Sequence, residues 1–216
     1  MVKLHFSTSR VARLLRAVLS GGVARVVSSA ITLLSLPLAV RYLGAERYGV
    51  WATIATTAVW INLLDLGIAN TLTNKISQAY ARNDKQYAAR FFANALVLTA
   101  AMAGLAAIAG AWLLRVVNWT RLLNVGPRVN AGEVRHTIAV AMALMLLALP
   151  CNLVNKVLAG YQELHRSNYA ACAGAVAGLC GLGLGIALRV SMPVLFVLSA
   201  GCLTFANLAM LVFVVG

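Results

Sequence analysis

Six long apolar segments follow one another along this chain. A helix needs about 20 apolar residues to span the hydrocarbon core of a bilayer. The chain is 62% hydrophobic and only 11% charged, which is more apolar surface than a soluble core can bury. We therefore expect an all-α, polytopic membrane protein, with a basic cytoplasmic segment at 1–17 and a six-helix transmembrane bundle at 18–216. The expected spans are 18–40, 49–69, 91–114, 137–159, 169–189 and 192–216.

The charges lie mainly between these apolar segments. Lys and Arg number 18 against five Asp and Glu, a balance that in a soluble protein would favour nucleic acid as the partner. Membrane anchoring explains it better here, so we expect lipid contacts and no nucleic acid. A cytoplasmic N-terminus places more basic residues on the cytoplasmic side than on the opposite one, as the positive-inside rule requires.

The sequence shows no apparatus for catalysis. The motifs HExxH, GxSxG and GxxxxGK[ST] are absent, the four cysteines fall inside apolar segments without CxxC spacing, and the three histidines are scattered. We expect a protein that is not an enzyme and that needs neither a cofactor nor a metal.

Arg25 and Asp65 are ionisable residues within apolar segments. A charge at mid-depth costs about 2.5 to 3.5 kcal/mol on insertion scales, so it needs a partner, a wet cavity or a route to the surface. Arg25 either snorkels to the cytoplasmic surface or faces a water-filled cavity, where a guanidinium can bind a phosphate through two parallel hydrogen bonds. Asp65 snorkels poorly, so a structural ion pair or a hydrogen bond to backbone donors is its simplest interpretation.

Asparagines mark the end of the fourth segment. Asn152, Asn155 and Lys156 share a helix face by their three- and four-residue spacing. Such a face suits sugar hydroxyls and phosphate, but asparagines also bridge helices and a lysine also reaches the interface. Asn70 and Asn74 extend a similar polar edge after the second segment, within a polar stretch that we expect to form an amphipathic helix continuing from that segment.

Pro150 lies near the middle of the fourth segment. Its missing N–H and its ring free the carbonyl of Leu146 and bend the helix. The bend is either a hinge for transport or a static kink.

Two stretches resemble a known family. Residues 42–51 read YLGAERYGVW and are followed by LLDLG at 63–67 and by Asn74-Lys75; residues 158–162 read LAGYQ, with Asn168 nearby. They resemble bacterial polysaccharide flippases, the O-antigen and capsule translocases of the multidrug/oligosaccharidyl-lipid/polysaccharide exporter superfamily. The resemblance covers about residues 20–90 and 145–175.

The resemblance implies one six-helix lobe of a two-lobe protein that moves undecaprenyl-diphosphate-linked sugars across the bacterial inner membrane. Arg25 would hold the diphosphate, Arg41 would line the outer vestibule, and Asp65 is the candidate for coupling to protons or sodium. The remaining expected substrate contacts are Asn70, Asn74, Lys75, Asn152, Asn155 and Lys156.

The chain departs from the family in having one lobe where two are expected. The apolar run 203–215 also lacks a charged anchor after it. We expect either a portion of a larger protein or an assembly with a second lobe, a second copy or polysaccharide polymerase components. The alternatives are a cation-coupled drug or metabolite exporter and a membrane scaffold that transports nothing.

Overall fold

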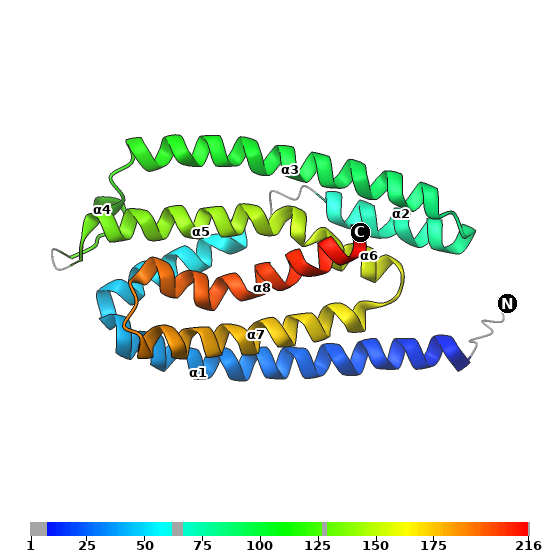
Figure 1. Cartoon of the computed structure of the whole chain (residues 1–216), viewed down its shortest axis with the longest axis horizontal. Helices are drawn as coiled ribbons and strands as arrows, with labels where there is room; N and C mark the ends of the chain where they lie inside the picture. The colour runs from blue at the N-terminus through cyan, green and yellow to red at the C-terminus, as the bar shows by residue number, and fades with distance from the viewer. Residues whose placement is uncertain (1–7, 62–66, 127–128, 216) are drawn as a thin grey trace.

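The computed structural model describes residues 8–61, 67–126 and 129–215, and this part of the chain is built from helices joined by short links (Figure 1). The prediction of an all-α fold is confirmed. The helices are α1 (Thr8–Ile61), α2 (Ile68–Arg82), α3 (Lys85–Val116), α4 (Trp119–Leu122), α5 (Ala131–Cys151), α6 (Leu153–Gly160), α7 (Leu164–Ala187) and α8 (Met192–Val215).

Within the described residues, five helical stretches are long and apolar enough to cross a membrane. They are Val18–Thr57, Lys85–Val116, Ala131–Gly160, Leu164–Ala187 and Met192–Val212. The first of them contains most of α1, which covers the first apolar segment and the N-terminal part of the second. The six separate crossings expected from the sequence therefore stay a prediction.

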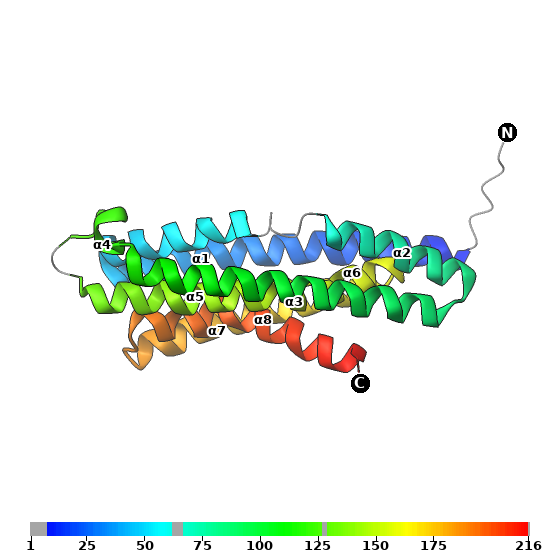
Figure 2. The same ribbon diagram turned by 90° about the horizontal axis from the view of Figure 1, so that it is seen from above.

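Gly44 divides α1 into two limbs, residues 8–43 and 45–61. Its backbone is not helical, with φ 76° and ψ 167°, a conformation that is essentially restricted to glycine. Figures 1 and 2 show that the chain reverses here, so that the second limb runs back along the bundle. Sequence reasoning placed a short link between two helices at this point; the structure needs only one non-helical residue.

The prediction of one helix over 49–69 was wrong at its C-terminal end. Gly67 has φ 82° and stands immediately before α2, and a left-handed residue cannot lie inside an α-helix. The stretch that follows is therefore a separate amphipathic helix and does not continue the second segment. The buried face of α2 consists of Ala69, Leu72, Ile76 and Ala79. Asp65 lies outside the described residues.

The fourth segment is interrupted close to Pro150. α5 begins at Ala131, where Oδ1 of Asn130 accepts the Gly132 N–H at 2.8 Å. It ends at Cys151, and α6 begins at Leu153 after the single residue Asn152. The expected bend is thus present as a one-residue break two residues after Pro150, whose nitrogen has no hydrogen to donate to the carbonyl of Leu146. Movement at this bend stays a prediction.

The links between helices gather at the two ends of the bundle. The start of α1, the α2–α3 turn and the α6–α7 link lie at one end, which we call the N-terminal end (right in Figure 1). The bend of α1, the α3–α5 connection and the α7–α8 connection lie at the opposite, distal end. This alternation is the arrangement that successive membrane crossings require.

Two apolar clusters hold the bundle together. α7 packs against the first limb of α1 and against α8, while α5 packs between α3 and α8. The cluster in the distal half joins α1, α5, α7 and α8, and its members include Leu43, Val50, Ile54, Val134, Ile138, Leu182, Leu195 and Phe196. The other joins α2, α3 and α6 through Leu72, Ile76, Ala79, Ala88, Ala95, Leu153 and Val157.

Candidate functional site

A groove of about 880 Å³ lies between the first limb of α1 and the start of α7. Arg25 lines it together with Ser28, Ser29 and Asn168. The side chain of Arg25 is exposed, and of the carboxylates that the structure describes none pairs with it. The structure therefore places the one arginine of the first apolar segment beside a concave surface with several polar groups.

A hydrogen bond between helices closes one side of this groove. Nδ2 of Asn168 on α7 donates to Oγ of Ser20 on α1 at 3.0 Å. A Cβ on Gly21 would lie 3.5 Å from the same Nδ2, an ordinary van der Waals contact, so α7 packs against α1 at this point. Sequence reasoning missed the serines of this groove, because a serine in an apolar helix gives no signal until the neighbouring helix is known.

A chain of side-chain hydrogen bonds links the α5–α6 break to α7 and α8. Oγ of Ser167 donates to Oδ1 of Asn155 at 2.7 Å, Nδ2 of Asn155 donates to Oδ1 of Asn207 at 3.4 Å, and Nδ2 of Asn207 donates to Oδ1 of Asn152 at 3.0 Å. Asn152 and Asn155 are thus brought together as expected, and Asn155 has the helix-bridging role. Ser167 and Asn207 were missed, although Asn207 is the single amide within the last apolar segment.

A cavity of about 270 Å³ reaches the α8 end of this amide chain. It lies between the second limb of α1, α5 and α8, and Asn152 and Asn207 line it together with Trp51, Phe196 and Thr204. Asn207 and Thr204 are buried, with exposed fractions of 6% and 8%. This cavity combines aromatic and uncharged polar walls and is separate from the groove beside Arg25.

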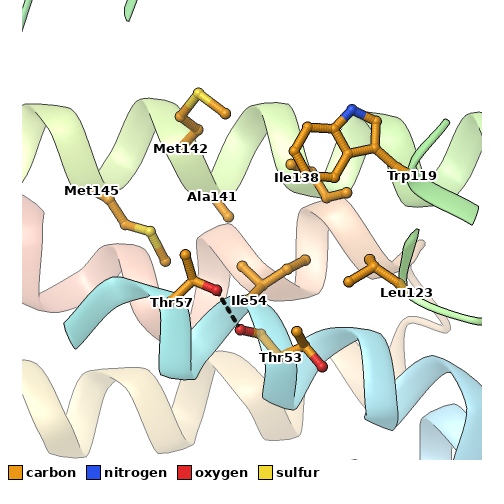
Figure 3. A pocket seen from close by; sticks show the side chains of 9 residues that line it. All are labelled: Thr53, Ile54, Thr57, Trp119, Leu123, Ile138, Ala141, Met142 and Met145. Carbon is orange, nitrogen blue, oxygen red and sulfur yellow. Dashed lines mark hydrogen bonds between the residues drawn. The ribbon is translucent and has the colours of Figure 1, made fainter. Parts of the chain in front are cut away.

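A smaller cavity of about 110 Å³ lies nearer the distal end, under Trp119 (Figure 3). Its two threonines are satisfied, because Oγ1 of Thr53 donates to the carbonyl of Gly49 at 2.9 Å and Oγ1 of Thr57 to that of Thr53 at 2.8 Å. Nε1 of Trp119 is buried without a hydrogen-bond partner among the described residues, but Figure 3 shows it on the ring edge away from Thr57. The cavity is otherwise walled by apolar side chains.

The other predicted site residues are spread over the bundle. Asn70 and Asn74 are exposed on α2, and Nζ of Lys75 lies 5.4 Å from the centre of the Phe91 ring. Lys156 is half-buried on α6, and its backbone carbonyl accepts from Oγ1 of Thr73 at 3.3 Å. None of these residues lines the Arg25 groove.

Arg41 is exposed near the distal end of α1. It lies about 24 Å further along the helix than Arg25, at a rise of about 1.5 Å per residue. The two arginines therefore belong to different parts of the bundle and cannot hold one phosphate group together.

No protein-family model, curated protein or solved structure matches this chain.

Part of the stretch that carries the family resemblance is structural in this bundle. Tyr42 donates its hydroxyl to the carbonyl of Val190 at 2.8 Å, which fastens α1 to the α7–α8 connection. A Cβ on Gly126 would lie 2.6 Å from Oε1 of Glu46, so the carboxylate packs directly on the backbone of the connection before α5. These residues shape the distal end and do not line the Arg25 groove.

Proposed function

We propose that the chain forms one lobe of a flippase for lipid-linked oligosaccharides in the bacterial inner membrane, with its N-terminus in the cytoplasm. The observation that carries this proposal is the position of Arg25 in the α1–α7 groove, without a carboxylate partner among the described residues. A guanidinium in such a place binds a phosphate or diphosphate through paired N–H donors.

The surroundings of Arg25 suit an amphiphilic ligand. Arg25 lies seven residues after Val18, where the apolar stretch of α1 begins, or about 10 Å along the helix. Ser28 and Ser29 offer hydroxyls beside it. The apolar side chains of Val18, Leu19, Val23 and Val26 are well exposed on the same limb. A phosphorylated headgroup would lie in the groove while an isoprenoid chain runs along these side chains.

A translocation pathway needs walls on all sides, and this bundle supplies one. We expect the facing wall to come from a second lobe or from a second copy of the chain. In this arrangement each limb of α1 crosses the membrane separately, which gives six crossings. The groups that would contact the glycan are Asn70 and Asn74 of α2, Asn155 of α6, and Asn152, which lies between α5 and α6.

Binding to the purified protein tests the role of Arg25. The chain would be placed in lipid nanodiscs and titrated with an undecaprenyl-diphosphate-linked sugar. A separate titration would use undecaprenol, the isoprenoid alcohol that carries no phosphate. We expect Arg25→Ala to weaken binding of the diphosphate lipid by about ten- to one-hundredfold, as expected for losing hydrogen bonds to a charged group. Binding of the alcohol should change little.

Arg115→Ala is the matched control, since Arg115 is an exposed arginine in the last turn of α3. It should bind the diphosphate lipid like the wild type. Equal affinity of the wild type and Arg25→Ala for the diphosphate lipid would contradict the proposal. Arg25→Lys separates charge from geometry, because a lysine keeps the charge but lacks the planar pair of donors.

A further inference from the structure

The cavity between the second limb of α1, α5 and α8 has two contrasting walls. Trp51 and Phe196 form the aromatic wall, with ring centres 5.1 Å apart and planes inclined by 58°. Asn152, Thr204 and Asn207 form the polar wall. None of the described residues that line this cavity carries a charge. A ligand of this cavity must therefore be neutral, and it must have both an apolar face and hydrogen-bonding groups.

Thr204 has an unused hydroxyl. Seven other helical threonines donate to the carbonyl four residues earlier, namely Thr32, Thr53, Thr57, Thr71, Thr73, Thr99 and Thr137. Thr204 is 8% exposed and lines the cavity, yet its hydroxyl makes no hydrogen bond within the described part of the chain. The Thr204 oxygen is not one of the buried side-chain atoms that lack a partner, so it is open to the cavity and can bond a group that enters it.

The amide chain determines which atom Asn152 offers to the cavity. The donor direction runs from Ser167 through Asn155 and Asn207 to Oδ1 of Asn152. Oδ1 of Asn152 therefore accepts from Asn207. Nδ2 of Asn152 is then a donor without a partner among the residues described, and it lies at the cavity wall. The cavity thus presents an N–H₂ donor from Asn152 beside the Thr204 hydroxyl, which can donate or accept.

We propose that this cavity binds a neutral polyhydroxylated ring, such as a single pyranose sugar residue. The C–H face of the ring lies against Trp51 and Phe196, since aromatic faces are electron-rich and attract the weakly positive C–H groups. Its hydroxyls accept from Nδ2 of Asn152 and exchange a hydrogen bond with Oγ1 of Thr204. A volume of about 270 Å³ is just below the range of about 300 to 1,000 Å³ for drug-sized ligands, which fits one ring and not an oligosaccharide. Because Asn152 is also one of the residues expected to contact the glycan, the inference rests in part on the proposed function, and free sugars test it apart from Arg25 and from the lipid.

The test is saturation-transfer NMR on the full chain in nanodiscs, with glucose and N-acetylglucosamine as the neutral probes and glucuronate as the charged one. We expect transfer to the ring protons of at least one neutral sugar and little or none to glucuronate. Thr204→Val removes the hydroxyl without removing any hydrogen bond between described residues, so the fold should persist. It should raise the dissociation constant by about two- to tenfold, the size of one lost neutral hydrogen bond.

Thr99→Val is the matched control. Thr99 is also buried, at 4% exposed, but its hydroxyl bonds the carbonyl of Ala95 at 2.8 Å, and it lines no part of this cavity. The Thr99→Val protein should bind the sugar with the same affinity as the wild type. Three results would overturn the proposal. The first is no saturation transfer to either neutral sugar, and the second is an unchanged dissociation constant in Thr204→Val. The third is glucuronate binding as tight as glucose binding.

Discussion

Arg47 and Glu133 join the bend of α1 to the start of α5, with Nη2 of the guanidinium 3.1 Å from Oε2 of the carboxylate. The second oxygen, Oε1, accepts the backbone N–H of Met192 at 3.2 Å, at the beginning of α8. One carboxylate therefore ties three helices together at the distal end. The side chain of Glu133 is 15% exposed and that of Arg47 is 43% exposed, so the backbone bond is better shielded from water than the arginine is.

Substitutions of Glu133 should separate these two contacts. Glu133→Gln keeps an oxygen that can accept from Met192, and we expect it to lower the free energy of unfolding by less than about 1 kcal/mol, the usual size of an ion pair with an exposed partner. Glu133→Ala loses both contacts and should cost about 1 to 3 kcal/mol. Thermal unfolding in detergent measures both variants. Arg47→Ala should match Glu133→Gln, and a larger loss than that of Glu133→Ala would contradict this division.

Gly44 should tolerate no side chain. Its φ of 76° with ψ of 167° strains any L-residue, so we expect Gly44→Ala to destabilise the bundle by about 1 to 3 kcal/mol. Gly49→Ala is the control, because Gly49 is helical with nothing within 4 Å of an added Cβ. It should be neutral or stabilising by up to about 1 kcal/mol. Denaturant titration of the two variants compares them; equal stabilities would show that the bend does not need glycine.

Gly178 allows α7 and α8 to approach closely. A Cβ at this position would lie 2.5 Å from the carbonyl oxygen of Ser199, and backbone cannot move aside as a flexible side chain can. We expect Gly178→Ala to cost about 1 to 3 kcal/mol through overpacking. Gly183→Ala, on the same helix but with open space around the added Cβ, should be neutral or stabilising by up to about 1 kcal/mol. If Gly178→Ala were as stable as the wild type, α7 and α8 could move apart without a loss of unfolding free energy, which would contradict this prediction.

Asn207 is the centre of the amide chain, so its replacement should affect both neighbours. Asn207→Leu leaves Nδ2 of Asn155 and Oδ1 of Asn152 without their partner. Hydrogen bonds between membrane helices contribute about 0.6 kcal/mol on average and up to about 1.7, and we expect a loss of about 1 to 2 kcal/mol in unfolding free energy. Asn94→Leu changes an exposed asparagine of α3 and serves as the control. Equal effects of the two substitutions would rule out a special role for the chain.

The sequence was sufficient for the local properties of this protein. Long apolar segments predict helices because every backbone polar group must be satisfied within the segment when lipid surrounds it. The same reasoning placed a bend near Pro150, where the missing N–H is a property of one residue, and paired Asn152 with Asn155 on one helix face. These inferences need only the order of residues along one helix.

The tertiary structure decided what depends on two or more helices. The sequence predicted a link between the first two spans, but it did not show that Gly44 alone makes the reversal or that Gly67 is left-handed. Glycine is compatible with both helix and bend, and the packing of the limbs selects between them. Asn207 and Thr204 are isolated polar residues in an apolar run, and the hydrogen bond from Asn207 to Asn152 and the cavity beside Thr204 arise only because α5 packs against α8. Whether a polar side chain is bonded within its own helix, shared with a neighbour or left facing a cavity is set by the positions of the helices. Hydropathy along the chain carries no information about those positions.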